Sequence, residues 1–476
     1  MAPRHMDRLS SLDVSFLANE SSSSHMHVGG ILIFEGPPPS YEDLLEHVNS
    51  RLHLVPRFRQ KLIHPPAQTG RPFWIDDPSF NLEYHVRHSA LPAPGSEEQL
   101  RRMAGRVFSQ RLDRTKPLWE LWLVQGLTRK RFALVTKTHH ALVDGISGVD
   151  IATVLFDLKP VPEPVEADDH WVPSPEPSRA TLVAKGIEDL FATPVRAARR
   201  LERAVEHPEQ ALRQATGAVE GIAEIGWNFA NPAPDVPLNV EIGSHRRFEW
   251  VRGDLGQFKK VKDALGGTVN DVVLAVVAGA LRDWLQGRGI RTQGLELRAQ
   301  VPVSIRATDE RGQLGNRLTA MRAPLPVYVT DPVRRLHTVS QAMAGLKQSK
   351  QALGAEAISR FNDFAPPTLL AQAARINFST RLFNLVVTNV PGPQVPLYLL
   401  GREQEDVFPV GFLPPNQALF VAIISYNGGM NFGLLADYDA MGDVHVVAEG
   451  IERAIAELVE AADAAAEQPA TEPAPA

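Results

Sequence analysis

Two adjacent histidines in the first half of the chain are the residues best suited to move a proton. They are His139 and His140 in the segment TKTHHALVDG, residues 136–145. Histidine is the side chain that most often acts as a general acid or base near neutral pH. Because side chains alternate in direction along a strand, a strand running through His140 would point the two imidazoles to opposite faces. One should then face a cavity while the other packs or hydrogen-bonds internally.

A metal site and a purely structural pair are the alternatives for these histidines. Neighbouring histidines on a strand do not easily converge on one ion, and the nearby sequence offers no third ligand, so we expect no zinc site. Two buried, satisfied histidines are the commoner outcome for such a pair taken by itself. Asp144-Gly145 should end the strand in a turn, where Asp144 caps the following helix or holds the loop.

Other catalytic chemistries find little support. The chain has no cysteine, which removes disulfides, thiolate nucleophiles and cysteine-ligated zinc. Ser147 lies in GISG, which is not the G-x-S-x-G nucleophile elbow. Neither the phosphate-binding nor the dinucleotide-binding glycine pattern occurs. We therefore expect no cofactor and no metal.

Length and composition are those of a globular protein with a large core. The chain has 476 residues, of which 44% are hydrophobic and 22% charged. A net charge of −6 gives no overall basic field for nucleic acid. We see no secretory signal, and the longest uncharged apolar run, Val272 to Leu281, is shorter than the ~20 residues of a membrane span. We expect a cytoplasmic protein that meets membranes only at their surface.

Hydrophobic periodicity predicts two mixed halves joined by a different kind of segment. In residues 1–158 it predicts strands at 28–34, 118–124 and 132–140, a hairpin loop at 126–130, and helices at 41–52 and 146–158. Residues 159–245 read as a proline-rich linker, 159–177, and a helical crossover, 181–230. In residues 246–463 we expect helices at 270–285 and near 446–461, and strands at 295–303, 385–389 and 419–426. The tail, 464–476, should be disordered, and a ligand site should lie between the halves.

Several further motifs accompany HHALVDG, which itself matches the pattern HHxxxDG of acyl-CoA-dependent acyltransferases and peptide-synthetase condensation domains. They are LD at 12–13, MHVGG at 26–30, PLWE at 117–120, NDVVLA at 270–275, VPVS at 301–304, GN at 315–316, TNVPGP at 388–393 and SYNG at 425–428. With this set, residues 7–462 resemble the bacterial wax ester synthase/diacylglycerol acyltransferase family, especially its actinobacterial triacylglycerol synthases. The proline-rich linker matches least well.

The resemblance implies a fold and a catalytic group. The fold would be α/β, with two halves like chloramphenicol acetyltransferase and the active-site tunnel between them. His140 would be the general base, with His139 and Asp144 in supporting roles. A thioester already has a good leaving group, so activating the alcohol is the harder task. A well-placed base contributes roughly 10²–10⁴ to the rate of that step.

Candidates for the oxyanion donors lie in the second half. A tetrahedral intermediate requires such donors, and we consider Asn270, Thr388 and Asn389. Asn270 could equally be a plain helix N-cap. Trp119 is expected in the core, and Pro391 to Pro393 should form a rigid turn.

The substrates come from the resemblance alone. It implies a long-chain acyl-CoA donor and, as acceptor, diacylglycerol or a long-chain alcohol, giving triacylglycerol or wax ester. A condensation-type enzyme with a carrier-protein donor is one alternative, which PLWE, NDVVLA and the lack of a recognisable carrier domain argue against. A non-catalytic lipid-binding protein is another, which the intact HHALVDG argues against.

A stripe of arginines is the one physical hint of a membrane surface. Arg196, Arg199, Arg200 and Arg203 share one face of a predicted helix, with Val195, Ala198, Leu201 and Val205 largely on another. The stripe is either a solvated face or a docking surface for anionic lipid. In the second case the protein would associate peripherally with membranes or lipid droplets.

Overall fold

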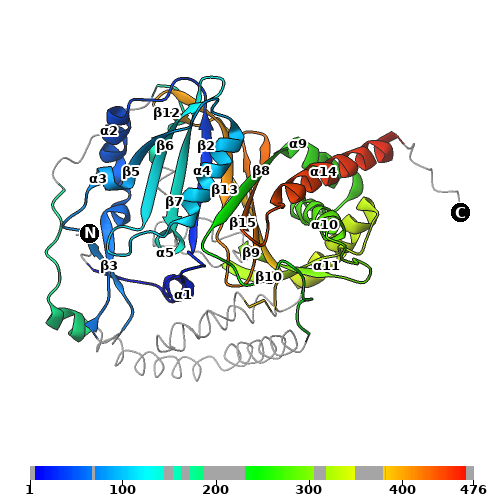
Figure 1. Ribbon diagram of the computed structural model, residues 1–476, viewed down its shortest axis with the longest axis horizontal. Coiled ribbons are helices and arrows are strands. Elements are labelled where there is room, and N and C mark those ends of the chain that lie inside the picture. The colour runs from blue at the N-terminus through cyan, green and yellow to red at the C-terminus, as the bar shows by residue number, and fades with distance from the viewer. Residues whose placement is uncertain are drawn as a thin grey trace, which may run out of the picture.

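The computed structural model describes residues 6–66, 70–143, 154–161, 171–185, 231–304, 318–348, 379–380 and 382–467. Two six-stranded sheets lie side by side in this part of the chain, with helices packed on them (Figure 1). A third, three-stranded sheet lies beside the first and consists of β1 (Asp7–Arg8), β4 (Phe73–Asp76) and β3 (Gln60–Ile63).

The first large sheet combines strands from both halves of the sequence. Its order is β12 (Tyr398–Leu399), β13 (Arg402–Val410), β2 (His27–Phe34), β7 (Arg131–His139), β6 (Trp119–Leu127) and β5 (Val86–Ala90). Only β5 and β6 are parallel. Helices α2 (Tyr41–Arg51), α3 (Leu82–His85) and α4 (Glu97–Ser109) accompany this sheet. The strands β12 and β13 therefore leave the second half of the chain to complete a sheet of the first.

The second large sheet is built from the second half alone. Its order is β10 (Leu318–Leu325), β9 (Leu297–Ser304), β11 (Leu385–Pro391), β14 (Leu419–Tyr426), β15 (Gly429–Asp437) and β8 (Arg246–Asp254). Strands β9, β11 and β14 are parallel to one another. The helices α9 (Leu255–Leu265), α10 (Val269–Gly287), α11 (Pro332–Gln348) and α14 (Val444–Glu467) form the layer on its far side (Figure 1).

Helix α10 is the buried element of this helical layer. Thr268 caps it in a capping box with Asp271, and the residues from Asp271 to Leu281 are all buried. A helix that is apolar on nearly all sides must be covered on all sides, and α10 packs against α9, α11 and α14. No single described helix is long and apolar enough to cross a membrane. Only α9 and α10 together reach that length and composition, across a bend of 100°.

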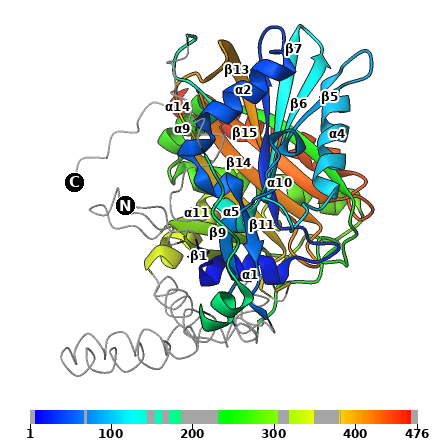
Figure 2. The ribbon, with the colours of Figure 1, turned by 90° about the vertical axis from the view of Figure 1, so that its left-hand side faces the viewer.

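The two large sheets are joined by close packing of α4 and β13 against the second sheet (Figure 2). Trp250 of β8 stacks on Phe408 of β13 with ring centroids 4.4 Å apart. Gly433 of β15 lies so near β13 that a Cβ atom there would stand 1.8 Å from the carbonyl oxygen of Pro409. At the edge, the Arg246 N–H donates to Ser109 Oγ over 2.8 Å. The junction is therefore a packed core in its own right.

Most predicted elements occur close to their expected bounds. Strands β2, β6, β9, β11 and β14 and helices α2, α10 and α14 are confirmed. The predicted hairpin loop is shorter than expected, because Gly126 and Leu127 still belong to β6 beside a bulge. Helix α14 continues to Glu467, four residues into the segment for which we expected disorder; residues 468–476 lie outside the described part.

The connection between the halves is described only in part. Of the predicted helix 146–158, residues 146–153 lie outside the described residues, and Asp157 forms a bridge with Tyr398 instead of helix. Of the crossover, residues 186–230 lie outside. The described end of the proline-rich segment packs on the body of the protein: Trp171 contacts Phe80 and lies under Arg59, whose guanidinium carbon is 4.9 Å from the ring centroid.

Candidate active site

His140 lies where the two halves of the chain meet. The prediction that β7 runs through His140 is wrong by one residue, because β7 ends at His139 and His140 begins the short helix α5 (His140–Val143). The half-buried imidazole stacks on Phe16 of α1 (Ser11–Asn19), with ring centroids 3.9 Å apart and planes inclined by 20°. Phe412, which follows β13, meets its edge at 5.6 Å. Its ring is thus held between aromatic groups from both halves.

His139 is fully buried and differs in kind from its neighbour. Its side chain is 1% exposed, and its Nδ1 accepts a hydrogen bond of 3.1 Å from the Ala141 N–H. A neutral imidazole whose Nδ1 accepts must carry its proton on Nε2. Burial, followed by the positive charge of Arg114, lowers the pKa of His139 to about 3. His139 is therefore neutral at ordinary pH, as expected for the internally bonded member of the pair.

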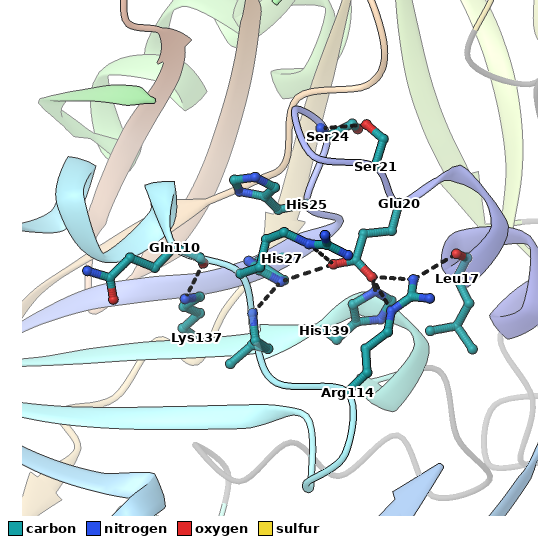
Figure 3. Close-up of polar contacts among 12 residues, drawn as sticks. Leu17, Glu20, Ser21, Ser24, His25, His27, Gln110, Arg114, Lys137 and His139 are labelled. Atoms are coloured by element: carbon teal, nitrogen blue, oxygen red, sulfur yellow. Dashed lines mark hydrogen bonds and ion pairs between the residues drawn. The ribbon is translucent and has the colours of Figure 1, made fainter. Parts of the chain in front are cut away.

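A buried carboxylate faces His139. Glu20 follows the C-terminal end of α1, is 1% exposed, and places Oε2 3.7 Å from His139 Nε2 (Figure 3). Arg114 forms a close ion pair with the same oxygen, and Arg111 Nε lies 3.4 Å from Oε1. His27, which pairs with His139 across β2 and β7, brings its Nε2 to 3.9 Å from Oε1. This buried charge is thus balanced by arginines and flanked by two imidazoles.

The imidazole of His27 is also held in one state by its surroundings. Burial, then the charge of Lys137, lowers its pKa well below the usual range. Its Nε2 accepts a hydrogen bond of 3.4 Å from the Leu112 N–H. Neutral His27 and neutral His139 leave Glu20 with the arginines as its charged partners.

Lys137 joins β7 to the end of α4. Its ammonium is fully buried and donates to the carbonyl oxygens of Val107 and Gln110, at 3.0 and 2.6 Å. A cation at a helix C-terminus satisfies free carbonyls and complements the helix dipole. Burial lowers the pKa of Lys137 to about 8, although Glu120 opposes this shift. Lys137 thereby positions the chain that leads from α4 to Arg111 and Arg114.

The MHVGG motif supports the strand end that carries both histidines. The Met26 carbonyl accepts a hydrogen bond of 2.9 Å from the His140 N–H. Gly29 lies against β7 so closely that a Cβ atom there would stand 1.9 Å from the Thr136 carbonyl oxygen. Gly29 therefore allows the backbones of β2 and β7 to approach closely, because it has no side chain. The LD motif is also structural at Asp13, which forms a capping box with Ser10 at the start of α1.

The remaining predicted residues are distributed over the second half or lie outside the described part. Asn270 is half-buried in the first turn of α10, and the N-cap interpretation is wrong for it, because Thr268 occupies that position. Thr388 and Asn389 are half-buried near the carboxyl end of β11. Trp119 is in the core, where its Nε1 donates to the Phe58 carbonyl over 2.7 Å. Outside the described residues lie Asp144, Ser147 and the arginines Arg196, Arg199, Arg200 and Arg203.

Sequence reasoning missed Phe16, Glu20, Arg114 and Phe412. Glu20 stands in the polar run NESSSS, which looks like a solvated loop. Its only signal is position, between the LD and MHVGG motifs. Phe16 and Phe412 look like ordinary core residues until the fold brings them to His140.

Two packed α/β halves, with a half-buried histidine of an HHxxxDG motif at their junction, match the fold and motif expected of an acyltransferase with a fold like that of chloramphenicol acetyltransferase. A model of the wax ester synthase/diacylglycerol acyltransferase catalytic domain matches residues 9–273, and one of the corresponding C-terminal domain matches residues 314–459. The chain belongs to this family and is an enzyme, as the motifs predicted.

Relatives of the same type match over nearly the whole chain. A Mycobacterium tuberculosis protein named "Probable diacyglycerol O-acyltransferase tgs1" is 33% identical, over 95% of this chain and 96% of its own. A second Mycobacterium tuberculosis protein, named "Probable diacyglycerol O-acyltransferase tgs2", is 33% identical over 90% of this chain and 94% of its own.

Solved structures support the fold. The wax ester synthase/diacylglycerol acyltransferase from Marinobacter aquaeolei has a TM-score of 0.69 at 28% identity, covering 96% of this chain and all (100%) of its own. The first condensation domain of the calcium-dependent antibiotic synthetase has a TM-score of 0.57 at 16% identity, with 96% of each chain covered. The predicted fold of two related halves is thereby confirmed.

Proposed function

We propose that the chain transfers a long-chain acyl group from acyl-CoA to the free hydroxyl of diacylglycerol, forming triacylglycerol, and that His140 is the general base. Long-chain alcohols would be alternative acceptors and give wax esters. The observation that carries the assignment of the base is the contrast within the histidine pair. His139 is enclosed and internally bonded, whereas His140 is half-buried at the junction of the halves. The names of the relatives support the acceptor.

In the proposed reaction, the His140 imidazole carries one proton from the acceptor hydroxyl to the CoA sulfur. His140 takes the proton of the acceptor hydroxyl as the alcohol oxygen attacks the thioester carbonyl carbon. The tetrahedral intermediate collapses as the carbon–sulfur bond breaks, and the imidazolium returns the proton to the departing CoA sulfur. Stacking on Phe16 restricts rotation of the His140 ring, so the base is oriented before substrate binds.

Among the candidates for the oxyanion donors we favour Thr388 and Asn389. Strand β11 pairs with β9 only at Leu385 and Val386, and with β14 along its length. The edge of β11 that faces β9 therefore has no ladder partner at Thr388 and Asn389 among the described residues. Asn270 is the weaker candidate because it lies in a helix turn next to the glycine pair 266–267. Of this pair, Gly267 lies close to Ser340 of α11.

Purified protein tests the proposal directly. We expect acyl transfer from palmitoyl-CoA to dioleoylglycerol, and to hexadecanol as second acceptor, followed as release of free CoA thiol. His140→Ala serves as the inactive reference. Activity only with a carrier-protein thioester would favour the condensation-type alternative. Binding of both lipids without turnover by the wild-type protein would favour the lipid-binding alternative.

We also propose that the enzyme collects its acceptor at a membrane or lipid-droplet surface. Both acceptors are nearly insoluble in water. The arginine stripe, Arg196, Arg199, Arg200 and Arg203, supplies charge for contact with anionic lipid, about 1 kcal/mol for each residue near the surface. Replacing all four by Gln should weaken co-sedimentation with anionic liposomes and leave activity on detergent-solubilised substrate near normal. Equal sedimentation of variant and wild type at low salt would show a merely solvated helix face.

A further inference from the structure

Glu20 is a buried charge whose place in the fold needs a reason beyond stability. Its carboxylate is 1% exposed. Its arginine partners are not: the Arg111 and Arg114 side chains are 47% and 35% exposed. Burying a carboxylate costs free energy that ion pairs with partly solvated partners recover only in part. A neutral residue here would avoid that cost, since both arginines reach solvent.

The path from Glu20 to His140 is short and runs through His139. Glu20 Oε2 faces the Nε2 atom of His139, which carries the proton because Nδ1 accepts from the Ala141 N–H. Ala141 is the residue directly after His140. The carboxylate therefore favours the one tautomer of His139 that can hold the backbone of the turn carrying His140.

Helix α1 touches both imidazoles of the pair. Phe16 stacks on His140, and Glu20, four residues later, faces His139. The Glu20 N–H donates to the Phe16 carbonyl over 3.1 Å, which keeps the two residues on one rigid helix end. Beyond Glu20 the chain turns sharply, with the Ser21 N–H bonded to the Ser24 carbonyl at 2.8 Å, and returns to β2 beside His27. This turn is in turn anchored to the second half, because Ser24 Oγ donates to the Leu413 carbonyl over 2.6 Å.

We propose that Glu20 is a positioning residue for acyl transfer: its carboxylate holds His139 in the Nε2-protonated tautomer, and His139 in turn holds the turn that aims His140 at the acceptor hydroxyl (Figure 3). The inference rests on the proposed role of His140 as base. Glu20 touches no substrate in this scheme. Its effect should therefore fall on turnover and not on the binding of acyl-CoA.

Two substitutions of Glu20 should lower kcat to different extents. Glu20→Ala removes the negative charge that stands 3.7 Å from His139 Nε2, and we expect kcat to fall about 10- to 100-fold, as misplacement of a catalytic group does. Glu20→Gln should lose less, because its amide oxygen can keep a partial negative charge opposite the same Nε2 atom. KM for palmitoyl-CoA should stay within about 2-fold for both variants, since the groups that bind acyl-CoA are unchanged.

Glu97→Gln is the matched control. Glu97 also pairs with two arginines, Arg131 at 3.1 Å and Arg252 at 2.8 Å, but lies at the opposite end of β7. We expect its kcat to remain near wild type. A general loss of ion pairing would affect both glutamates, whereas a positioning role affects only Glu20.

A double-mutant cycle with His139→Ala decides whether Glu20 acts through His139. If it does, Glu20→Ala should lower kcat no further in the His139→Ala background. Multiplying effects, a change in KM alone, or wild-type kcat in Glu20→Ala would overturn the inference. Should Glu20→Ala fail to fold, the same criteria apply to Glu20→Gln. His140→Ala separates the two proposals: if it is active, the proposed base is wrong, and if it is inactive while Glu20→Ala is normal, only the positioning role is wrong.

Discussion

The two ends of strand β7 contain the same ingredients in different surroundings. At the end nearer the β6–β7 turn, Glu97 pairs with Arg131 and Arg252 around a cavity of about 510 Å³, lined also by Ser96, Thr128, Arg129 and Asp406. At the other end, Glu20 pairs with Arg111 and Arg114 beside His139. One glutamate and two arginines thus occur at each end.

Burial distinguishes the two clusters. The Glu97 side chain is 23% exposed and that of Glu20 is 1% exposed. Burial alone would raise the pKa of Glu97, but hydrogen bonds and charge from Arg252 and Arg131 outweigh it, and the pKa is lowered. Water near Glu97 screens these charges. At Glu20, neutral imidazoles replace water, so a charge there can influence the state of a neighbouring ring. The same residue types therefore form a partly solvated ion-pair cluster at one end and a buried one beside His139 at the other.

The largest expected effect is a loss of turnover on substitution at the histidine end of β7. His140→Ala should lower kcat by at least about 100-fold, because it removes the general base. Palmitoyl-CoA should still bind, which isothermal titration of the variant can measure. Retention of more than about a tenth of wild-type kcat would show that another group is the base.

The second-largest effect is expected for Asp144, in the same motif as the two histidines. Asp144→Asn keeps the shape of the side chain and removes its charge. If Asp144 braces the loop, the variant should unfold at lower temperature and show reduced turnover, less severely than His140→Ala. Differential scanning calorimetry beside the activity assay tests this. A variant as stable as wild type and as inactive as His140→Ala would assign Asp144 an electrostatic role in catalysis instead.

The pH dependence of stability should differ between wild type and His139→Gln. In the unfolded chain His139 takes up a proton near pH 6.5, whereas in the folded protein it does so only near pH 3. Between these values the unfolded state binds more protons, so the stability of wild type falls as pH is lowered, by up to ~1.4 kcal/mol per pH unit from this one group. His139→Gln lacks this contribution. Urea unfolding of both proteins from pH 7 to 4 measures it, and parallel curves would contradict the burial argument.

The smallest effect is expected at the Glu97 end. Arg252→Gln breaks ion pairs of a side chain that is 41% exposed. We expect unfolding free energy to change by less than about 1 kcal/mol, and the difference to shrink as salt is added. Turnover should be unaffected. A loss of turnover like that of Glu20→Ala would remove the contrast between the two ends.

Local patterns in the sequence determined much of the fold. Alternating and helical periodicity located β2, β6, β14, α2 and α10, because these elements bury a face that their own residues specify. The HHxxxDG motif singled out both histidines, and together with the accompanying motifs it indicated the family. Strand parity predicted one packed and one cavity-facing imidazole; His139 is indeed enclosed, but His140 lies beyond the strand end, so parity does not orient it.

Only the tertiary structure decided which distant residues complete the site. No local pattern indicates that β13 leaves its own half to pair with β2, since the pairing of strands far apart in the sequence depends on packing over the whole molecule. Nor does the polar run around Glu20 indicate burial. Its carboxylate becomes a buried charge only because Arg111 and Arg114, more than ninety residues away, reach it across the end of β7. Burial and charge pairing are properties of the folded chain, and they turn an ordinary surface-like glutamate into a neighbour of the histidine pair.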